Sequence, residues 1–166
     1  MAIPSVIPPR GRALEPAELD EILADSTEII ESSHLFKTLD EEGRRDLIRT
    51  GYVISYDPGQ TIMKQGDIGS TMFIVMRGKV AVETNRGATG SIHLAELGRG
   101  ACIGEVGVLT GGPRTATVKA IDDVKVIAFE KHRVQRVIDA YPKVRKLLEA
   151  MIEGRARDTV EKLIGS

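Results

Sequence analysis

Residues 58–82 read PGQTIMKQGDIGSTMFIVMRGKVAV, a stretch in which short apolar runs alternate with turn residues. The runs TIMK and TMFIVM are rich in Thr, Ile, Val and Phe, residue types that favour strands. Gly59, Gly66 and Gly78 separate the runs, and glycine readily adopts the positive φ angles that tight turns require. The stretch therefore predicts short strands joined by tight turns.

The period of two continues on both sides of this stretch, from Tyr52 to Glu130. Further short runs in this region are YVISY, KVAVET, SIHLAEL and VKVIAFE. Short strands at such regular spacing are typical of sandwiches and small barrels of the jelly-roll kind. We therefore expect a mainly β protein with flanking α-helices: an eight-stranded jelly-roll β-sandwich or barrel with N-terminal helices and C-terminal lid helices.

Helical spacing of apolar residues flanks the β region. Before it, Asp40 can cap a helix that ends near Gly51. Further upstream, Pro16 suits the first turn of another helix, and five apolar residues follow it at helical spacing: Leu19, Ile22, Leu23, Ile29 and Ile30. After the β region, helical spacing resumes at Val134 and stops at Pro142, and a final helix is predicted over residues 142–163.

Length and composition are those of one soluble globular domain. The chain has 166 residues, of which 42% are hydrophobic and 28% charged, and its formal net charge of −1 argues against binding to nucleic acid. No segment approaches the ~20 apolar residues that cross a bilayer, and no apolar run near the N-terminus is long enough for a signal peptide. With a single cysteine, Cys102, no internal disulfide can form. We expect a cytoplasmic protein that binds neither nucleic acid nor membranes.

Proline and charge divide the chain into three parts. Residues 1–14 are predicted to be a flexible proline-containing leader, residues 15–33 an acidic N-terminal helix, and residues 34–166 the main domain with its C-terminal helices. The acidic helix has seven acids and no Lys or Arg, whereas residues 131–166 have nine bases and five acids, a local charge of +4. Two interpretations stay open: solvated helix faces, or attraction of the two ends to each other or to a protein partner.

Residues 103–115 read IGEVGVLTGGPRT, with one acid, Glu105, and one base, Arg114, in an otherwise uncharged and glycine-rich run. A tight turn or helix start between Gly104 and Leu109 would direct several N–H groups and a positive dipole end at one point. The Arg114 guanidinium matches phosphate oxygens, whereas the Glu105 carboxylate suits a sugar hydroxyl and repels phosphate. The residues by themselves indicate either a ribose phosphate site or a structural turn with a surface ion pair.

Residues 100–118, GACIGEVGVLTGGPRTATV, resemble the phosphate-binding cassette of cyclic nucleotide-binding domains. The family pattern is F-G-E-(L/I)-A-L-(L/I), a few residues, and then (P)-R-(S/T/A)-A. The opening stretch, residues 58–82, is similar to the strand and glycine-turn half of the same domains, and SHLFKTLDEE is similar to their opening helix. The resemblance covers about residues 34–160 and implies a cAMP or cGMP sensor domain, as found in kinase regulatory subunits, bacterial channels and catabolite activator proteins.

The resemblance implies a role for each residue of the site. Glu105 would accept a hydrogen bond from the ribose 2′-hydroxyl, and Arg114 would hold the cyclic phosphate with the N–H and hydroxyl of Thr115 beside it. Backbone groups of Gly104 and Gly107 would line the sugar and phosphate. The other expected contacts are Val106 in the same cassette and four residues that would flank the base: Val80, Val82, Cys102 and Ile103.

Three positions depart from the family pattern. Ile103 replaces an aromatic residue, Gly107 replaces an alanine, and Ser70 replaces an aspartate that orients the arginine in kinase regulatory subunits. In addition, Arg155 aligns with an arginine that covers the purine in channel domains, where stacking would stabilise a closed lid by about 0.5–2 kcal/mol. A solvated helix arginine is the alternative for Arg155.

These observations predict a stand-alone regulatory protein that is not an enzyme and needs no metal. We expect it to bind cAMP, and also cGMP because Thr115 is compatible with both, and to signal to a protein effector through movement of the C-terminal helix. The alternatives are an interaction module that keeps the fold without a ligand and a cupin-type metalloenzyme. The metalloenzyme is disfavoured because the three histidines lie far apart in the sequence: His34, His93 and His132. Few residues follow the last predicted helix, so we expect no helix-turn-helix domain.

Overall fold

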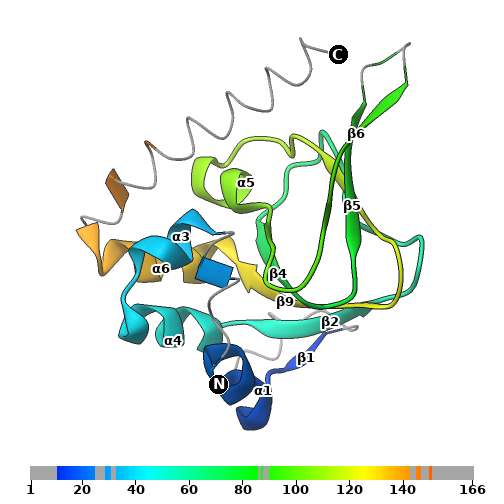
Figure 1. The fold of residues 1–166 in the computed structure, drawn as a ribbon. Helices are drawn as coiled ribbons and strands as arrows, with labels where there is room; N and C mark the ends of the chain where they lie inside the picture. The colour runs from blue at the N-terminus through cyan, green and yellow to red at the C-terminus, as the bar shows by residue number, and fades with distance from the viewer. Residues whose placement is uncertain are drawn as a thin grey trace.

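Two antiparallel sheets and a group of helices make up the part of the chain that this computed structural model describes (Figure 1). The described residues are 11–24, 29–30, 33–85, 87, 90–142, 145–146 and 150. This architecture confirms the prediction of a mainly β protein with flanking helices.

The first sheet contains β1 (Gly11–Ala13), β2 (Tyr52–Tyr56), β4 (Thr71–Arg77), β7 (Cys102–Ile103) and β9 (Val124–Glu130). The second sheet contains β3 (Thr61–Met63), β5 (Val80–Asn85), β6 (Ser91–Leu97) and β8 (Thr117–Ala120). The strand orders are β1-β2-β9-β4-β7 and β3-β8-β5-β6. Every pairing in both sheets is antiparallel.

The longer strands were predicted at their observed positions, and three short ones were not. The six predicted runs correspond to β2, β3, β4, β5, β6 and β9. Strands β7 and β8, which have 2 and 4 residues, were not among the predicted runs. Strand β1, which pairs with β2, lies inside the segment that was predicted to be a flexible leader. The described residues therefore form nine strands rather than eight, arranged as two separate sheets rather than a closed barrel.

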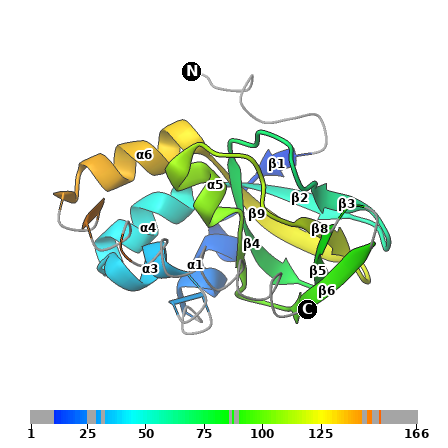
Figure 2. The same ribbon diagram turned by 90° about the horizontal axis from the view of Figure 1, so that it is seen from above.

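Five helices lie fully within the described residues: α1 (Pro16–Ala24), α3 (His34–Thr38), α4 (Glu41–Arg49), α5 (Glu105–Thr110) and α6 (Lys131–Asp139). As predicted, Asp40 caps α4: its Oδ1 accepts from the Gly43 N–H at 2.8 Å. Figures 1 and 2 both show α1, α3, α4 and α6 gathered on one side of the first sheet, away from β5 and β6. Within the described ranges, no helix has the length and apolar character needed to cross a membrane.

Parts of the predicted helices fall outside the described residues. Helix α1 covers the first half of the acidic helix predicted over residues 15–33, and Ile29 and Ile30 further along are also helical. Nearly all of the final helix predicted over residues 142–163, including Arg155, lies outside the described residues.

The first sheet is buried on both faces, because its central strands are apolar at nearly every position. In β4, Met72 and Ile74 pack into a core on the helix side, whereas Phe73 and Val75 pack into a second core between the two sheets. Successive side chains of a strand point to opposite faces, so a strand with two buried faces needs apolar residues throughout. This explains why TMFIVM reads as a continuous apolar run.

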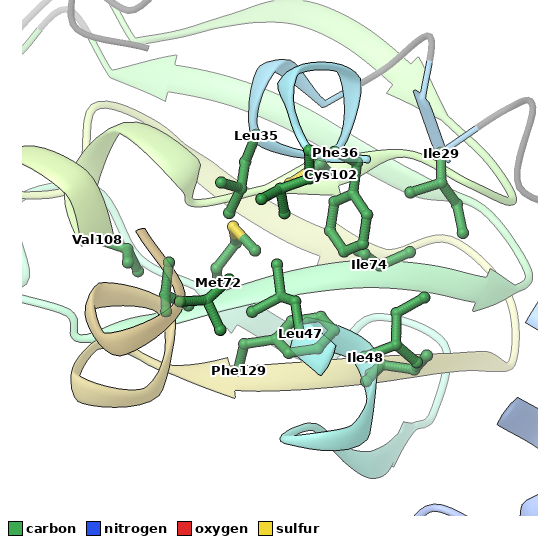
Figure 3. Packing of buried hydrophobic residues seen from close by; sticks show 14 of the residues in the cluster. Ile29, Leu35, Phe36, Leu47, Ile48, Met72, Ile74, Cys102, Val108 and Phe129 are labelled. Atoms are coloured by element: carbon green, nitrogen blue, oxygen red, sulfur yellow. The ribbon is translucent and has the colours of Figure 1, made fainter. Parts of the chain in front are cut away.

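Strand β9 divides its side chains in the same way. Ile127 and Phe129 belong to the helix-side core, and Val126 and Ala128 belong to the core between the sheets. Figure 3 shows the helix-side core, in which the rings of Phe129 and Phe36 are tilted against each other with centroids 6.3 Å apart. Complete burial of such a side chain stabilises the fold by about 1.5–3 kcal/mol.

An ion pair with two hydrogen bonds joins β1 to α1. Arg12 Nη1 and Nη2 donate to Glu18 Oε1 and Oε2 at 2.7 and 2.8 Å, and the Glu15 N–H donates to Glu18 Oε1 at 3.0 Å. The hydrogen bond from Arg12 lowers the pKa of Glu18 to about 2, from an ordinary value of 4.5. The stabilisation from this pair is therefore complete above pH 4.5 and is lost as the pH falls through about 2.

Replacing Glu18 by Gln is expected to lower the free energy of unfolding at neutral pH by about 1 kcal/mol, a modest value because Arg12 is 44% exposed and water screens the pair. The difference from the wild type should shrink below pH 4.5 and disappear near pH 2. Urea unfolding at a series of pH values measures both effects. Glu21→Gln on the same helix is the matched control, because Glu21 is 66% exposed and lies 3.9 Å from Arg99. An equal loss in the two variants would contradict the assignment.

Candidate functional site

A cavity of about 200 Å³ lies between the second sheet and the segment that contains α5. Its apolar lining comes mainly from the strands: Met63, Val82, Leu94, Leu97, Ile103 and Val118. Its polar lining comes from the segment around α5: Gly104, Glu105, Gly107, Arg114 and Thr115. The structure therefore brings the acid and the base of the glycine-rich run to one cavity.

The polar lining depends on a sharp change in backbone direction after β7. Gly104, with φ +80°, precedes the first residue of α5, and Gly111, with φ +76°, follows the last. Both glycines have left-handed backbone conformations, which are strained for residues with a side chain. The helix start predicted between Gly104 and Leu109 is present, and it places Glu105 at the first position of α5.

Arg114 is 7% exposed and is held by backbone groups. Its Nη2 donates to the Thr71 carbonyl at 2.6 Å, and its Nη1 donates to the Gly104 carbonyl at 3.3 Å. The Arg114 N–H donates to the Asp67 carbonyl at 2.8 Å, and the Arg114 carbonyl accepts from the Gly66 N–H at 2.9 Å. The loop that precedes β4 therefore holds the backbone of Arg114, whereas the first residue of β4 and Gly104 hold its side chain.

Three glycines leave the space that the Arg114 guanidinium fills. A Cβ atom would lie 2.1 Å from Nε at Gly69, 2.7 Å from Nη1 at Gly104 and 3.0 Å from Nη1 at Gly107. Contacts shorter than 3.0 Å are essentially never seen for a Cβ atom, so a side chain at Gly69 or Gly104 would displace the guanidinium. At Gly107, where the cassette pattern has alanine, the guanidinium would have to shift by only a few tenths of an ångström.

The surroundings of Arg114 favour an anionic ligand. Burial lowers the pKa of Arg114 from its ordinary value, and the negative charge of Asp67 opposes this shift. A desolvated cation bonded to neutral carbonyls is stabilised further by an anion beside it. Ser70, which replaces the family's aspartate, has another contact: its carbonyl accepts from the Lys131 N–H at 2.7 Å. The neighbouring Thr71 carbonyl orients the guanidinium instead.

Glu105 is completely buried, and its carboxylate connects the cavity to α3. Its Oε2 accepts from Ser33 Oγ at 2.7 Å, from the Leu35 N–H at 3.3 Å and from Cys102 Sγ at 3.6 Å. Because Glu105 is 0% exposed and Arg114 only 7%, they do not form the surface ion pair that the sequence left open.

Most of the predicted site residues line this one cavity: Val82, Cys102, Ile103, Gly104, Glu105, Gly107, Arg114 and Thr115. Val80 does not line it. That residue is 0% exposed and belongs to the core between the sheets, two residues along β5 from Val82 and beyond the reach of the cavity. Val106 lies in α5, and Arg155 lies outside the described residues.

The residues that hold the two charged side chains were not predicted from the sequence. Ser33 and Gly69 carried no recognisable signal, and Thr71 acts through a backbone carbonyl that any residue would supply. Within the part of the chain that the structure describes, no group of three or more His, Cys, Asp or Glu side chains could hold a metal ion. The lining suits a ligand with an anionic group, a hydroxyl group and an apolar body.

A profile of the family described as the cyclic nucleotide-binding domain matches residues 53–141, more than half of the chain. The chain belongs to this family. The matched range contains the whole polar lining of the cavity, including Glu105 and Arg114.

Similar proteins occur in several kinds of regulatory system. The chain is 27% identical over 135 residues to the cAMP-dependent protein kinase regulatory subunit of Blastocladiella emersonii, a match that covers 81% of this chain and 34% of that protein. It is 32% identical over 100 residues to the Homo sapiens cyclic nucleotide-gated channel alpha-2, covering 57% of this chain and 15% of the channel. The crystal structure of Thermus thermophilus catabolite activator protein matches with a TM-score of 0.68 and 29% identity, covering 79% of this chain and 62% of that one. The chain thus matches only part of each of these proteins.

Replacing Gly104 by Ala is expected to destabilise the fold by roughly 2–4 kcal/mol, because backbone strain at φ +80° adds to a Cβ atom 2.7 Å from Arg114 Nη1. Gly59→Ala is the matched control: Gly59 has φ +86°, but nothing lies within 4 Å of a Cβ there. That variant should lose only about 1 kcal/mol from strain. Urea unfolding of both variants compares the losses. Equal losses would show that the space beside Arg114 is not restricted.

Proposed function

We propose that this protein is a cyclic nucleotide-binding regulatory protein that binds cAMP, and also cGMP, and is not an enzyme. The main support is the convergence of a buried guanidinium and a buried carboxylate on one cavity, in a chain that belongs to the cyclic nucleotide-binding domain family. The similarity to a regulatory subunit named for cAMP-dependent kinase supports cAMP as the ligand. A stand-alone role and a cytoplasmic location are part of the proposal.

In this proposal each part of the cavity recognises one part of the nucleotide. Arg114, which is buried next to neutral carbonyls, binds the cyclic phosphate, and the exposed Thr115 adds its N–H and hydroxyl. Glu105 accepts from the ribose 2′-hydroxyl, and backbone groups of Gly104 and Gly107 lie along the sugar and phosphate. The base lies against the apolar lining that includes Val82 and Ile103.

The expected affinity follows from ligand size. A cyclic nucleotide has about 22 heavy atoms, and at about −0.3 kcal/mol per atom its binding free energy is about −7 kcal/mol, a dissociation constant of roughly ten micromolar. Thr115 is compatible with either base, so we expect cAMP and cGMP to differ in affinity by about tenfold or less, the equivalent of about 1.4 kcal/mol.

Replacing Arg114 by Gln is expected to abolish measurable binding, because the phosphate would be desolvated without its charged partner, at a cost of roughly 2–5 kcal/mol. Isothermal titration of the wild type and the variant with cAMP and with cGMP measures the effect. The matched control is Arg77→Gln, because Arg77 is exposed at the end of β4 and does not line the cavity.

The outcomes of this titration separate the candidate functions. Unchanged affinity in Arg114→Gln would show that the nucleotide binds elsewhere. If neither nucleotide binds to the wild type at high concentration, the protein is an interaction module that has kept the fold without the ligand.

We also propose that binding is signalled to a protein effector through the C-terminal helix. Helix α5 contacts α6, so the cassette is directly connected to the element that precedes residues 143–163. The acidic side chains of the predicted N-terminal helix and the basic ones of the predicted C-terminal helix are the candidates for effector contacts. In this proposal Arg155 covers the base when the nucleotide is bound.

Amide hydrogen exchange in residues 143–163 is expected to slow when cAMP is added, because docking of this segment over the base would protect its N–H groups. Mass spectrometry of peptides from this range, with and without cAMP, measures the change. Peptides covering β2 serve as the internal control, since this strand lies in the first sheet and contributes no residue to the cavity lining. Unchanged exchange in 143–163 at saturating cAMP would rule out the lid while leaving nucleotide binding intact.

A further inference from the structure

Ser33 is a buried residue whose hydroxyl serves two structural elements at once. It is 0% exposed, and its Oγ accepts from the Phe36 N–H at 3.2 Å, which makes Ser33 the N-cap of α3. The same Oγ donates to Glu105 Oε2 at 2.7 Å. One hydroxyl group therefore joins the start of α3 to the carboxylate at the start of α5.

Ser33 makes the shortest of the contacts described for the Glu105 carboxylate. The two others to Oε2 are the Leu35 N–H at 3.3 Å and Cys102 Sγ at 3.6 Å. A hydroxyl at 2.7 Å from a carboxylate oxygen is a strong, charge-assisted donor, whereas a thiol is a weak one. The orientation of the carboxylate is therefore set mainly from α3.

The surroundings make this support important. Leu35, Phe36 and Cys102 belong to the helix-side core, and Figure 3 shows them close together. A carboxylate beside such an apolar core is stable only where donors hold it, and removing a donor leaves part of its charge uncompensated. Without the Ser33 hydroxyl, Glu105 would lose the shortest of its described hydrogen bonds, and its position at the cavity would be less restricted.

We propose that Ser33 is a positioning residue for ribose recognition: through Glu105 it provides the preference for a nucleotide that carries a 2′-hydroxyl group. This inference rests on the proposed function, since it concerns the same cavity. It assigns the support of the sugar site to a side chain that lies 72 residues from Glu105 in the sequence, at the start of α3.

The test compares the affinities for cAMP and for 2′-deoxy-cAMP in the wild type, Ser33→Ala and Ser33→Gly, measured by isothermal titration. The wild type should bind the deoxy nucleotide roughly 10- to 100-fold more weakly, the loss expected for a hydrogen bond to a charged group. Both variants should bind cAMP more weakly and 2′-deoxy-cAMP about as well as the wild type does, so that the ratio falls to within about threefold of unity. Glycine is well tolerated at an N-cap, so Ser33→Gly carries the test if Ser33→Ala does not fold.

Asp40→Ala is the matched control for the lost helix cap. Asp40 caps α4 through the Gly43 N–H at 2.8 Å and does not line the cavity, so its removal should leave the nucleotide ratio unchanged. The proposal would be overturned if the Ser33 variants kept the wild-type ratio, either with unchanged affinities or with equal weakening for both nucleotides. Either result would make Ser33 a structural residue only. If the wild type binds neither nucleotide, the proposed function itself is wrong and this inference with it, a result distinct from a retained ratio.

Discussion

A buried guanidinium must have hydrogen-bond acceptors and enough space, and this requirement determines the structure of the cavity wall around Arg114. The acceptors of Arg114 are the carbonyls of Thr71 and Gly104, and glycines at positions 69, 104 and 107 leave the space. These groups come from segments that are distant in sequence. The antiparallel pairing of β7 with β4 brings these segments together. An antiparallel bridge between Ile68, before β4, and Pro113, after α5, does the same. The position of one arginine thus accounts for two glycines of the cassette, Gly104 and Gly107.

The five-stranded sheet connects this site to the helices, because it separates two cores. Its edge strand β7 has only two residues, and they point to opposite faces: Cys102 packs into the helix-side core and Ile103 into the core between the sheets. Glu105 follows directly after the turn at Gly104. The cavity therefore lies where the two cores meet: the alternation of side chains along β7 places Ile103 with the apolar lining from the second sheet and Cys102 on the side that faces the helices.

The sequence predicted what depends on local pattern and missed what depends on contacts between distant segments. The strands with five or more residues, the Asp40 cap and the helix start after Gly104 follow from periodicity and from the conformational preferences of single residues. The residues of the cassette by themselves left a ribose phosphate site and a structural turn as alternatives for Glu105 and Arg114, and the resemblance favoured the first. The placement of Val80 in the core and the role of Ser33 were missed, because the depth of a cavity along a strand and a bond across 72 residues leave no local trace.

The Arg114 guanidinium and the Glu105 carboxylate are held by different kinds of group, and this difference determines which substitutions would disturb each of them. The described acceptors of Arg114 are backbone carbonyls, which remain when Thr71 is replaced by another residue, so the guanidinium depends on the glycines beside it and not on the side chain at position 71. Among the described contacts of the Glu105 carboxylate, the shortest comes from a side-chain hydroxyl, that of Ser33, which a single substitution removes. In the proposed function, the contacts that hold the phosphate-binding guanidinium therefore come from the backbone, whereas ribose recognition depends on the Glu105 carboxylate and on the Ser33 hydroxyl that donates to it.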